Sequence, residues 1–339
     1  MSNQLEPIDP ETAVEMYLDE RRHELTDATL QSHRYRLKQF TQWCDTEEIT
    51  NLNDFTGRDI HRYRVKRRNE DDLATATMKG QLATLRVFLR FCESIDAVHS
   101  GLGEKIILPT TTAEDAREEL LQPQTAQQVL TYLEEFEYAT LKHALLEVLW
   151  HTGLRIGAAV GIDVQDYDPD DQYLALVHRP EEGTTLKNKT KSERFVALND
   201  RICEVLDDWL EYNHSGVQDE YDRMPLFATS RARLSRSHAR TLIYECTRPC
   251  VFKNECPHDR EIKACEARQP GKAYKCPSSV SPHPIRRGAI THHLTEETPK
   301  PVVSDRMDVG PDVLDEHYDQ RSKQDKLQQR RQYLPDEEY

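Results

Sequence analysis

A stripe of apolar side chains late in the first hundred residues restricts what this part of the chain can fold into. Leu82, Leu85 and Leu89 follow one another at intervals of three and four, so they share one face of an α-helix over about 74–95. An amphipathic helix must bury that face against a partner. We therefore expect residues 1–97 to form one compact helical domain. The start signal Asp9-Pro10-Glu11 predicts a helix over about 10–22. A second apolar stripe predicts a helix from about 27, and another helix is expected over about 56–69.

The helical pattern stops near residue 98, and a mixed pattern follows. Residues 98–121 contain Gly, Pro and a Thr run without sustained periodicity, which predicts a linker. In residues 122–318, strand-like runs at 172–177 and on both sides of 184–198 interrupt the helices. The predicted fold is mainly α with a small antiparallel β-sheet, in two domains. Further helices are expected over about 124–135 and 138–151, and from about residues 200, 235, 284, 301 and 311. The polar tail, 319–339, is interpreted as a peripheral helix or a partly disordered segment.

The charge balance is strongly acidic. The chain has 60 acidic and 45 basic side chains, a formal net charge of −15, and 30 arginines against 15 lysines. Excess acid combined with a preference for arginine predicts a halophilic protein, and an ordinary acidic cytosolic protein is the alternative. At ~1 M salt the Debye length is only ~3 Å, so distant carboxylates no longer repel a polyanion. The net charge therefore does not exclude DNA as a partner.

The hydropathy pattern gives no sign of a membrane or a secretion signal. No stretch approaches the ~18 consecutive apolar residues of a membrane-spanning helix. The first residues, MSNQLEPIDPETA, lack the basic and apolar regions of a signal peptide. We expect a cytoplasmic protein without a membrane partner.

Two short segments are basic although the whole chain is acidic. The runs at 57–68, GRDIHRYRVKRR, and 229–244, TSRARLSRSHARTLIY, interleave arginines with Tyr, Ser and Thr, which suits contacts to a phosphate backbone. A solvated basic helix face is the alternative for each run. The predicted DNA contacts are Arg58, Arg62, Lys66, Arg67, Arg233, Arg236 and Arg240.

His283 and Arg286 lie three residues apart in SPHPIRRGAITHHL, after prolines that suit the start of a helix. This spacing puts both side chains on one face, where unpaired backbone N–H groups also attract anions. The pattern predicts a phosphate site. Three more polar residues stand in distinctive contexts: Arg155 follows a helix break in WHTGLR, Lys189 lies at the tip of the predicted hairpin, and Tyr318 lies in GPDVLDEHYDQR.

The ordered set of an Arg in Thr-Gly-Leu-Arg, a hairpin Lys, a His-x-x-Arg pair and a late Tyr resembles the tyrosine recombinase, or phage-type integrase, family. Lys189 fits the lysine position by its offset from Glu193 and Arg194, and Lys191 is the alternative. The N-terminal helices are similar to the family's core-binding domain, so the resemblance spans most of the chain. It implies a mixed α/β catalytic domain after the linker.

The resemblance implies a site-specific recombinase that cuts and rejoins double-stranded DNA through a 3′-phosphotyrosine. Arg155 and Arg286 would hold the non-bridging phosphate oxygens, and Tyr318 would attack phosphorus. Lys189 would protonate the leaving 5′-oxygen, and His283 would orient the phosphate or assist proton transfer. The resemblance also implies a homotetramer on DNA, no cofactor for catalysis and no small-molecule substrate.

Two positions depart from the family pattern. Val309 stands where the family has His or Trp, and Ala158 stands where it commonly has an acidic residue. His317 and Arg306 are candidate replacements for the missing donor. The departures keep a non-catalytic DNA-binding protein open as an alternative, beside a nicking and religating enzyme like type IB topoisomerases.

Two later tyrosines, Tyr333 and Tyr339, compete with Tyr318 as nucleophile. They lie in the charged tail, without a family-like context.

Five of the eight cysteines crowd into a segment at 246–276, which is not part of the general family pattern. Clustered thiols in a reducing compartment more often bind metal than form disulfides, and zinc takes four N or S ligands. The hypothesis is a structural zinc site, and a loop with free thiols is the alternative. The predicted ligands are Cys250, Cys256, Cys265 and Cys276, with His258 or Cys246 as alternates. The remaining cysteines, Cys44, Cys92 and Cys203, are expected in the cores.

Overall fold

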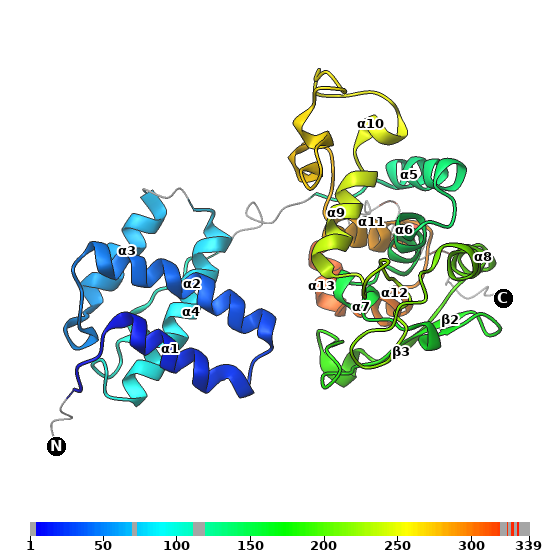
Figure 1. Cartoon of the computed structure of the whole chain (residues 1–339). Coiled ribbons are helices and arrows are strands. Elements are labelled where there is room, and N and C mark those ends of the chain that lie inside the picture. Colours follow the sequence, from blue (N-terminus) through cyan, green and yellow to red (C-terminus); the bar gives the residue numbers. More distant parts are fainter. Residues whose placement is uncertain are drawn as a thin grey trace, which may run out of the picture. The chain divides into compact units, whose positions relative to one another are not determined.

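The structure is a computed structural model that describes residues 5–69, 73–110 and 119–318, with residues 324, 327, 328 and 331, and without the side chains of 316 and 317. The chain divides into two compact units, Met1–Glu118 and Glu119–Tyr339 (Figure 1). Part of the predicted linker, most of the tail, and both Tyr333 and Tyr339 lie outside the described residues. Within the described part, no helix is long and apolar enough to cross a membrane.

The described residues of the first unit form helices joined by loops. The four helices predicted from the sequence are present. They are α1 (Pro10–Glu20), α2 (Asp27–Thr46), α3 (Gly57–Asn69) and α4 (Thr75–Ser94), and short 3₁₀ turns cover Arg21–His23, Leu52–Asp54 and Gly103–Lys105.

The first helix shows how the local sequence sets its boundary. The carboxylate of Asp9 accepts hydrogen bonds from the backbone N–H groups of Glu11 at 3.1 Å and Thr12 at 2.9 Å. Pro10 occupies the first helical position, where its missing N–H costs nothing. The cap therefore starts α1 at the position that the sequence predicts.

Aromatic side chains fill the core of the first unit. The ring of Phe40 meets the rings of Phe55 and Phe88 at centroid distances of 5.4 and 5.9 Å, both edge to face. Each such pair adds ~0.5–1.5 kcal/mol beyond the burial of its apolar area. Cys44 and Cys92 are fully buried in the same core, as predicted.

The second unit combines helices with a small sheet, which confirms the predicted fold class. Its longer helices are α5 (Pro123–Phe136), α6 (Leu141–Thr152), α8 (Asp200–Asp208), α9 (Arg236–Cys246), α11 (Pro282–Thr295), α12 (Lys300–Met307) and α13 (Pro311–His317). Two single-turn helices are α7 (Ile156–Ala159) and α10 (Pro249–Phe252), and the strands are β1 (Tyr167–Asp168), β2 (Tyr173–Leu176) and β3 (Arg194–Ala197).

The three strands form one antiparallel sheet in the order β1-β2-β3, with Leu174 opposite Val196. The prediction for the stretch 184–198 was half right. Its second side is β3, but its first side makes only an isolated bridge, between Thr184 and Arg179. The segment Lys189–Ser192 forms a 3₁₀ turn instead.

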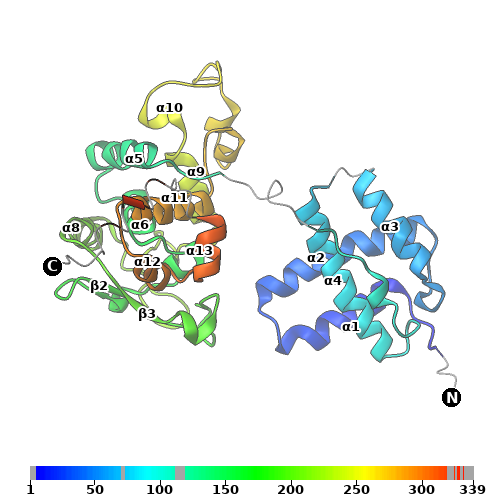
Figure 2. The same ribbon diagram turned by 180° about the vertical axis from the view of Figure 1, so that it is seen from behind.

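Helix α6 lies at the centre of the second unit, with α5, α8, α9 and α11 packed around it (Figure 2). Its residues are buried on nearly every side, including the polar side chains of His143 and Glu147. Gly288 on α11 allows close packing here. A Cβ at that position would lie 2.1 Å from the carbonyl oxygen of Leu121 and 2.9 Å from the Trp150 ring.

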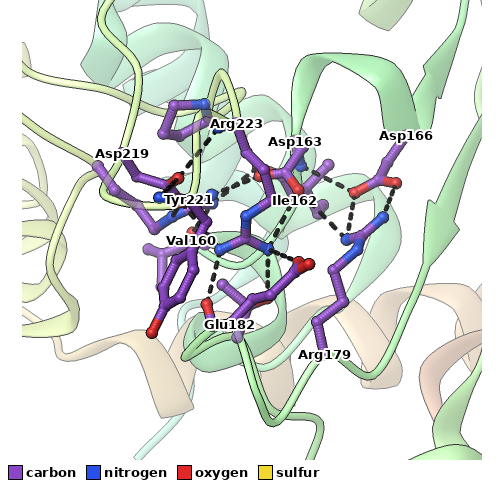
Figure 3. Close-up of polar contacts among 12 residues, drawn as sticks. Val160, Ile162, Asp163, Asp166, Arg179, Glu182, Asp219, Tyr221 and Arg223 are labelled. Atoms are coloured by element: carbon purple, nitrogen blue, oxygen red, sulfur yellow. Dashed lines mark hydrogen bonds and ion pairs between the residues drawn. The ribbon is translucent and has the colours of Figure 1, made fainter.

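A cluster of ion pairs ties the chain after α7 to the loops that follow β2 and α8 (Figure 3). Asp163 is fully buried and lies 3.3 Å from Arg179 and 3.4 Å from Arg223. Arg179 also pairs with Asp166 at 2.5 Å, and Arg223 with Asp219 at 2.9 Å. Buried charges are tolerated only when they are paired in this way.

Arg233 belongs to the same cluster, which corrects the expectation that it contacts DNA. Its guanidinium pairs with Asp163 and, at 2.7 Å, with Asp219. It also donates to the carbonyl oxygen of Val160 at 3.2 Å. Its donors are therefore used inside the protein, a placement that the basic run in the sequence did not reveal.

Candidate active site

The turn after α6 presents Arg155. Helix α6 ends at Thr152, and Gly153 takes the left-handed conformation, with φ of 60°, as its C-cap. A Cβ on Gly153 would lie 2.7 Å from the sulfur of Met307, so this turn requires glycine for both its conformation and its close packing. Two residues later, Arg155 stands at the N-cap of α7 with its side chain 30% exposed.

Arg286 lies on α11 and is buried, with 3% of its surface exposed. Its Nη1 donates to the carbonyl oxygen of Gly153 at 2.6 Å, and its Nη2 to that of Asp308 at 3.2 Å. Burial, followed by the charge of Arg155, lowers the pKa of Arg286 to about 10. The guanidinium is still protonated at neutral pH. Two cationic side chains thus lie near the Gly153 turn, close enough for the charge of one to act on the other, which favours binding of an anion there.

The side chain of Tyr318 reaches this pair of arginines. It lies close enough to Arg286 to raise the pKa of that guanidinium, against the lowering by burial and by Arg155. Its ring is 93% buried in an apolar cluster with Ile290, Val309 and Leu314, and the guanidinium carbon of Arg287 lies 5.9 Å from its centroid. The structure therefore brings Arg155, Arg286 and Tyr318 together from three separate segments.

His283 stands at the start of α11, as predicted. Its side chain is accessible to solvent, yet surrounding protein desolvates the ring enough to lower its pKa, and the charges of Arg286, Arg287 and Arg155 act in the same direction. The lowered pKa keeps the imidazole neutral at physiological pH, so it can accept a proton.

The charge of Lys187 also acts on His283, whereas the sequence pointed to Lys189 or Lys191. All three lysines are exposed on the segment between β2 and β3. Lys189 begins the 3₁₀ turn with φ of 58°. The sequence places lysines at every second position from 187 to 191. This spacing marks Lys187 as a third candidate beside the two predicted lysines.

The carboxylate of Asp308 was not predicted as part of the site. It pairs with Nη1 of Arg155 and accepts hydrogen bonds from Ser192 at 2.8 Å and from Asn188 at 3.1 Å. Asp308 therefore joins the Arg155 turn to the lysine-bearing segment. Its neighbour Val309 is 6% exposed and lies in the same apolar cluster as Tyr318. At the position where the family has His or Trp, this chain therefore has an apolar side chain that packs in the core.

Arg306 does not replace the missing His or Trp. Its Nη1 donates to the carbonyl oxygen of Ala197 at 2.8 Å and its Nη2 to that of His151 at 3.2 Å. These bonds attach α12 to β3 and α6. The side chain of His317, the other candidate, lies outside the described residues.

The remaining predicted DNA contacts differ in their solvent exposure and in the contacts that they make within the protein. On α9, Arg236 and Arg240 are exposed one turn apart, and the guanidinium of Arg236 lies against Gly157 on α7, close in sequence to Arg155. On α3, Arg58 is exposed and Lys66 is half-buried. Of the other two, Arg62 pairs with Glu47 and Asp59, and Arg67 donates to Gln81 at 3.1 Å.

The cysteine-rich segment folds around a small pocket. Its lining includes all four predicted zinc ligands and His258. Within the described residues, no three His, Cys, Asp or Glu side chains are arranged as a metal site. Cys246, an alternate ligand, instead lies in the main core with its thiol 3.4 Å from the carbonyl oxygen of Ile243. The zinc hypothesis is therefore not shown by this geometry.

Comparison with known proteins finds a family match for each of the two units. Residues 119–309 match the model of the phage integrase family, and residues 15–94 match the phage integrase N-terminal SAM-like domain. Tyrosine recombinase XerC of Staphylococcus aureus is 26% identical over 193 residues, which are 55% of this chain and 58% of XerC. The aligned region thus spans less than two thirds of that relative.

Solved structures share the fold at low sequence identity. The Tn1549 transposon integrase in complex with transposon right end DNA aligns with a TM-score of 0.64 at 13% identity, over 95% of this chain and 99% of that one. A lambda integrase bound as a dimer to a COC' core site aligns with a TM-score of 0.63 at 14% identity, over 94% and 79%. The family match covers more than half of the chain and contains Arg155, Lys189, His283 and Arg286, and on that ground the protein belongs to the phage integrase family.

Proposed function

We propose that this protein is a site-specific DNA recombinase, an enzyme that cuts and rejoins double-stranded DNA through a 3′-phosphotyrosine. The observation that carries the proposal is that Arg155 and Tyr318 both lie close enough to Arg286 to act on the pKa of its guanidinium. A phenol held next to two phosphate-binding side chains is placed to attack phosphorus. We also propose the cytoplasm as its location, because chromosomal DNA lies there in cells without a nucleus.

In the proposed first step, one scissile phosphodiester lies between Arg155 and Arg286. The arginines bind the non-bridging oxygens, whose negative charge grows in the transition state. The Tyr318 oxygen forms a bond to phosphorus, and the bond from phosphorus to the 5′-oxygen breaks. The phenol proton passes to a base, for which the neutral His283 is suited, and a lysine between β2 and β3 protonates the departing 5′-oxygen.

The second step reverses the first with another strand. A 5′-hydroxyl attacks the phosphotyrosine, the new phosphodiester forms, and Tyr318 regains its proton. One phosphoester bond is exchanged for another in each step, so rejoining needs no nucleotide hydrolysis. Two duplexes must exchange strands, and we propose that four copies of the chain assemble on them.

We propose that exposed basic side chains in both units bind flanking DNA. Arg236 and Arg240 on α9 and Arg58 on α3 are exposed, and Lys66 is partly so. Each phosphate contact adds roughly one to the slope of affinity against salt. At the molar salt that the acidic composition suits, the Debye length of ~3 Å makes local contacts more important than the distant net charge.

The experiment that tests the function is covalent capture on a nicked suicide duplex, in which the cleaved fragment diffuses away. The measurement is a protein–DNA adduct at the new 3′ end of the cleaved strand, at molar KCl and at ~0.1 M salt. Tyr318→Phe is expected to abolish the adduct, whereas Tyr244→Phe on α9 retains it. Binding without any adduct would identify a non-catalytic DNA-binding protein.

A capture reaction alone does not separate a recombinase from a type IB topoisomerase-like enzyme. Two duplexes carrying the same candidate target site are therefore incubated together. Exchange of flanking sequences supports a recombinase. Relaxation of supercoiled plasmid without exchange supports the topoisomerase-like alternative and contradicts the proposal.

We also propose that the cysteine-rich segment holds a structural zinc ion. In support, Cys250, Cys256, Cys265 and Cys276 line one pocket. Burial raises the pKa of Cys250, and the neighbouring thiols Cys276 and Cys256 raise it further, so the three sulfurs are close enough to interact. Four cysteines are a complete ligand set for tetrahedral zinc.

Metal analysis of the purified protein tests this proposal. One zinc per chain is expected, lost in Cys250→Ser and kept in Cys44→Ala, which changes a cysteine in the first unit. A metal-free, folded wild-type protein would identify a loop with free thiols.

A further inference from the structure

Asp308 occupies a junction between three parts of the candidate site. Its carboxylate pairs with Nη1 of Arg155, and its backbone oxygen accepts from Nη2 of Arg286 at 3.2 Å. Hence one residue at the end of α12 contacts both arginines that the proposed function assigns to the phosphate.

The same carboxylate holds the lysine-bearing segment. Oδ2 of Asp308 accepts from the Ser192 hydroxyl at 2.8 Å, and Oδ1 accepts from the Asn188 amide at 3.1 Å. Asn188 precedes the 3₁₀ turn that starts at Lys189, and Ser192 ends it. The position of this turn relative to Arg155 therefore depends on Asp308.

The carboxylate leaves most of the Arg155 guanidinium available. It contacts one terminal nitrogen, Nη1, and a guanidinium carries five N–H donors. The Arg155 side chain is 30% exposed and that of Asp308 17% exposed, so the arginine lies on the accessible side of the pair. Asp308 can thus brace Arg155 without covering it.

The local sequence supplies no other carboxylate for this task. Ala158 lies three residues after Arg155 on α7, at the position where the family commonly has an acidic residue. The backbone of Asp308 is in the left-handed region, with φ of 50°, a conformation that Asp tolerates better than most residues. This conformation caps α12 and turns the chain toward Val309.

The charge on Asp308 is retained in its setting. Burial alone would raise its pKa, but hydrogen bonds from Ser192 and Asn188 and the charge of Arg155 together lower it. An ionised carboxylate is what a guanidinium requires as a rigid partner.

We propose that Asp308 is a positioning residue for DNA cleavage. It fixes the position of the Arg155 guanidinium, so that this group can bind the scissile phosphate. It also holds the 188–192 segment so that the lysines of this segment lie near the same phosphate. This inference rests on the proposed recombinase function. It adds a residue for which neither the family resemblance nor the motif pattern provides a role.

Single-turnover covalent capture on the suicide duplex tests the inference. Asp308→Asn keeps the size of the side chain but removes its charge. We expect its capture rate to fall by roughly 10- to 100-fold, the cost of a misplaced catalytic group. DNA affinity and thermal melting temperature are expected to stay close to wild type. Asp308→Glu should recover part of the rate, because it restores the carboxylate.

The matched control is Asp305→Asn. It removes the same charge from an exposed position on α12. In the described part of the chain its carboxylate makes no hydrogen bond to Arg155 or Ser192, which bind Asp308 instead, so this variant should capture DNA at the wild-type rate. A general loss of negative charge would slow both variants equally and would contradict the inference.

A double-mutant cycle then tests whether Asp308 acts through Arg155. If it does, Asp308→Asn has little further effect in an Arg155→Lys background. Additive losses would show that Asp308 does not work through that guanidinium. A capture rate that rises in Asp308→Asn would mean that the carboxylate competes with the phosphate, and would overturn the positioning role.

The wild-type reaction distinguishes failure of this inference from failure of the proposed function. If wild-type protein forms no adduct on any candidate duplex, the function itself is wrong. If wild type and Asp308→Asn form the adduct equally fast, the function stands and the role of Asp308 is rejected.

Discussion

The buried guanidinium of Arg286 donates a 2.6 Å hydrogen bond to the carbonyl oxygen of Gly153. Gly153 ends α6, the helix at the centre of the second unit, and Arg155 follows two residues later. The bond therefore sets the distance between the two arginines from the backbone, before any DNA binds. Preorganised donors of this kind need no rearrangement as charge develops on a substrate.

Replacing Arg286 by lysine tests this arrangement. A lysine ammonium cannot reproduce the planar fork that meets the carbonyl oxygens of Gly153 and Asp308. We expect covalent capture to fall by at least roughly 100-fold, as for loss of one preorganised donor. Capture kinetics provide the measurement. A variant that captures DNA within a few-fold of wild type would show that charge alone is sufficient.

Gly288→Ala should strongly destabilise the second unit. The new Cβ would lie 2.1 Å from the Leu121 carbonyl oxygen, so α11 must move away from the chain that enters α5. Overpacking of this kind costs ~1–3 kcal/mol or more. Urea unfolding gives the change in free energy. Gly310→Ala is the control, since a Cβ there meets no atom within 4 Å, and equal loss in both variants would refute the packing argument.

Arg233 and Arg236 should separate stability from DNA binding, although both come from one basic run. Arg233→Ala leaves the fully buried Asp163 short of a partner, and breaking a buried pair costs ~3–5 kcal/mol. Arg236→Ala should leave unfolding unchanged and weaken DNA binding, with a shallower dependence on salt. Chemical denaturation and DNA titrations at several salt concentrations measure the two effects. Unchanged stability in Arg233→Ala would contradict the structural role.

Acid should weaken the second unit through Glu147. This side chain on α6 is fully buried. Burial opposes its ionisation, but the nearby rings of His143 and His151, at 3.4 and 3.0 Å, and the charge of Arg201 lower its pKa to about 2 from the ordinary 4.5. A lowered folded-state pKa contributes stability that is present above pH ~4.5 and lost as the pH falls toward ~2, roughly 3 kcal/mol in all. Unfolding free energies across that range should flatten in Glu147→Gln. An unchanged slope would remove Glu147 as the cause.

The lysine that protonates the leaving oxygen can be identified by changing the leaving group. A substrate with sulfur at the 5′-bridging position departs as a thiolate, whose lower pKa removes the need for a proton. Lys189→Ala should cleave the normal duplex slowly and the sulfur-containing duplex at nearly the wild-type rate. The same comparison with Lys187→Ala and Lys191→Ala is the control. If the sulfur-containing duplex restores the cleavage rate only in Lys187→Ala, then Lys187, whose charge acts on His283, is the general acid.

Much of this architecture was predictable because it depends on local signals. Helical periodicity gave α1 to α6 within a few residues, and the ordered motifs gave the family. The strand boundaries were harder, because the chain before β3 forms a 3₁₀ turn held by Asp308, a residue more than a hundred positions away. Pairings at that sequence separation leave no local pattern.

The errors concerned charged residues whose partners are distant in sequence. Arg233 looked like a surface arginine, since its partners Asp163 and Asp219 lie in other loops. Asp308 drew no attention because the family pattern has no acidic residue there. In both cases the composition of a short window gave the charge but not the side chain that neutralises it.

The cluster around Asp163 also bears on how the molecule responds to its ionic surroundings. Dissolved ions weaken attractions between exposed charges far more than those between buried ones. In concentrated brine, the pairs on the outside of the protein, such as Arg22 with Asp19, would contribute little, while the cluster continues to fasten three loops to the core. The buried ion pairs thus keep these loops attached at high salt, whereas dissolved ions screen the ion pairs on the surface.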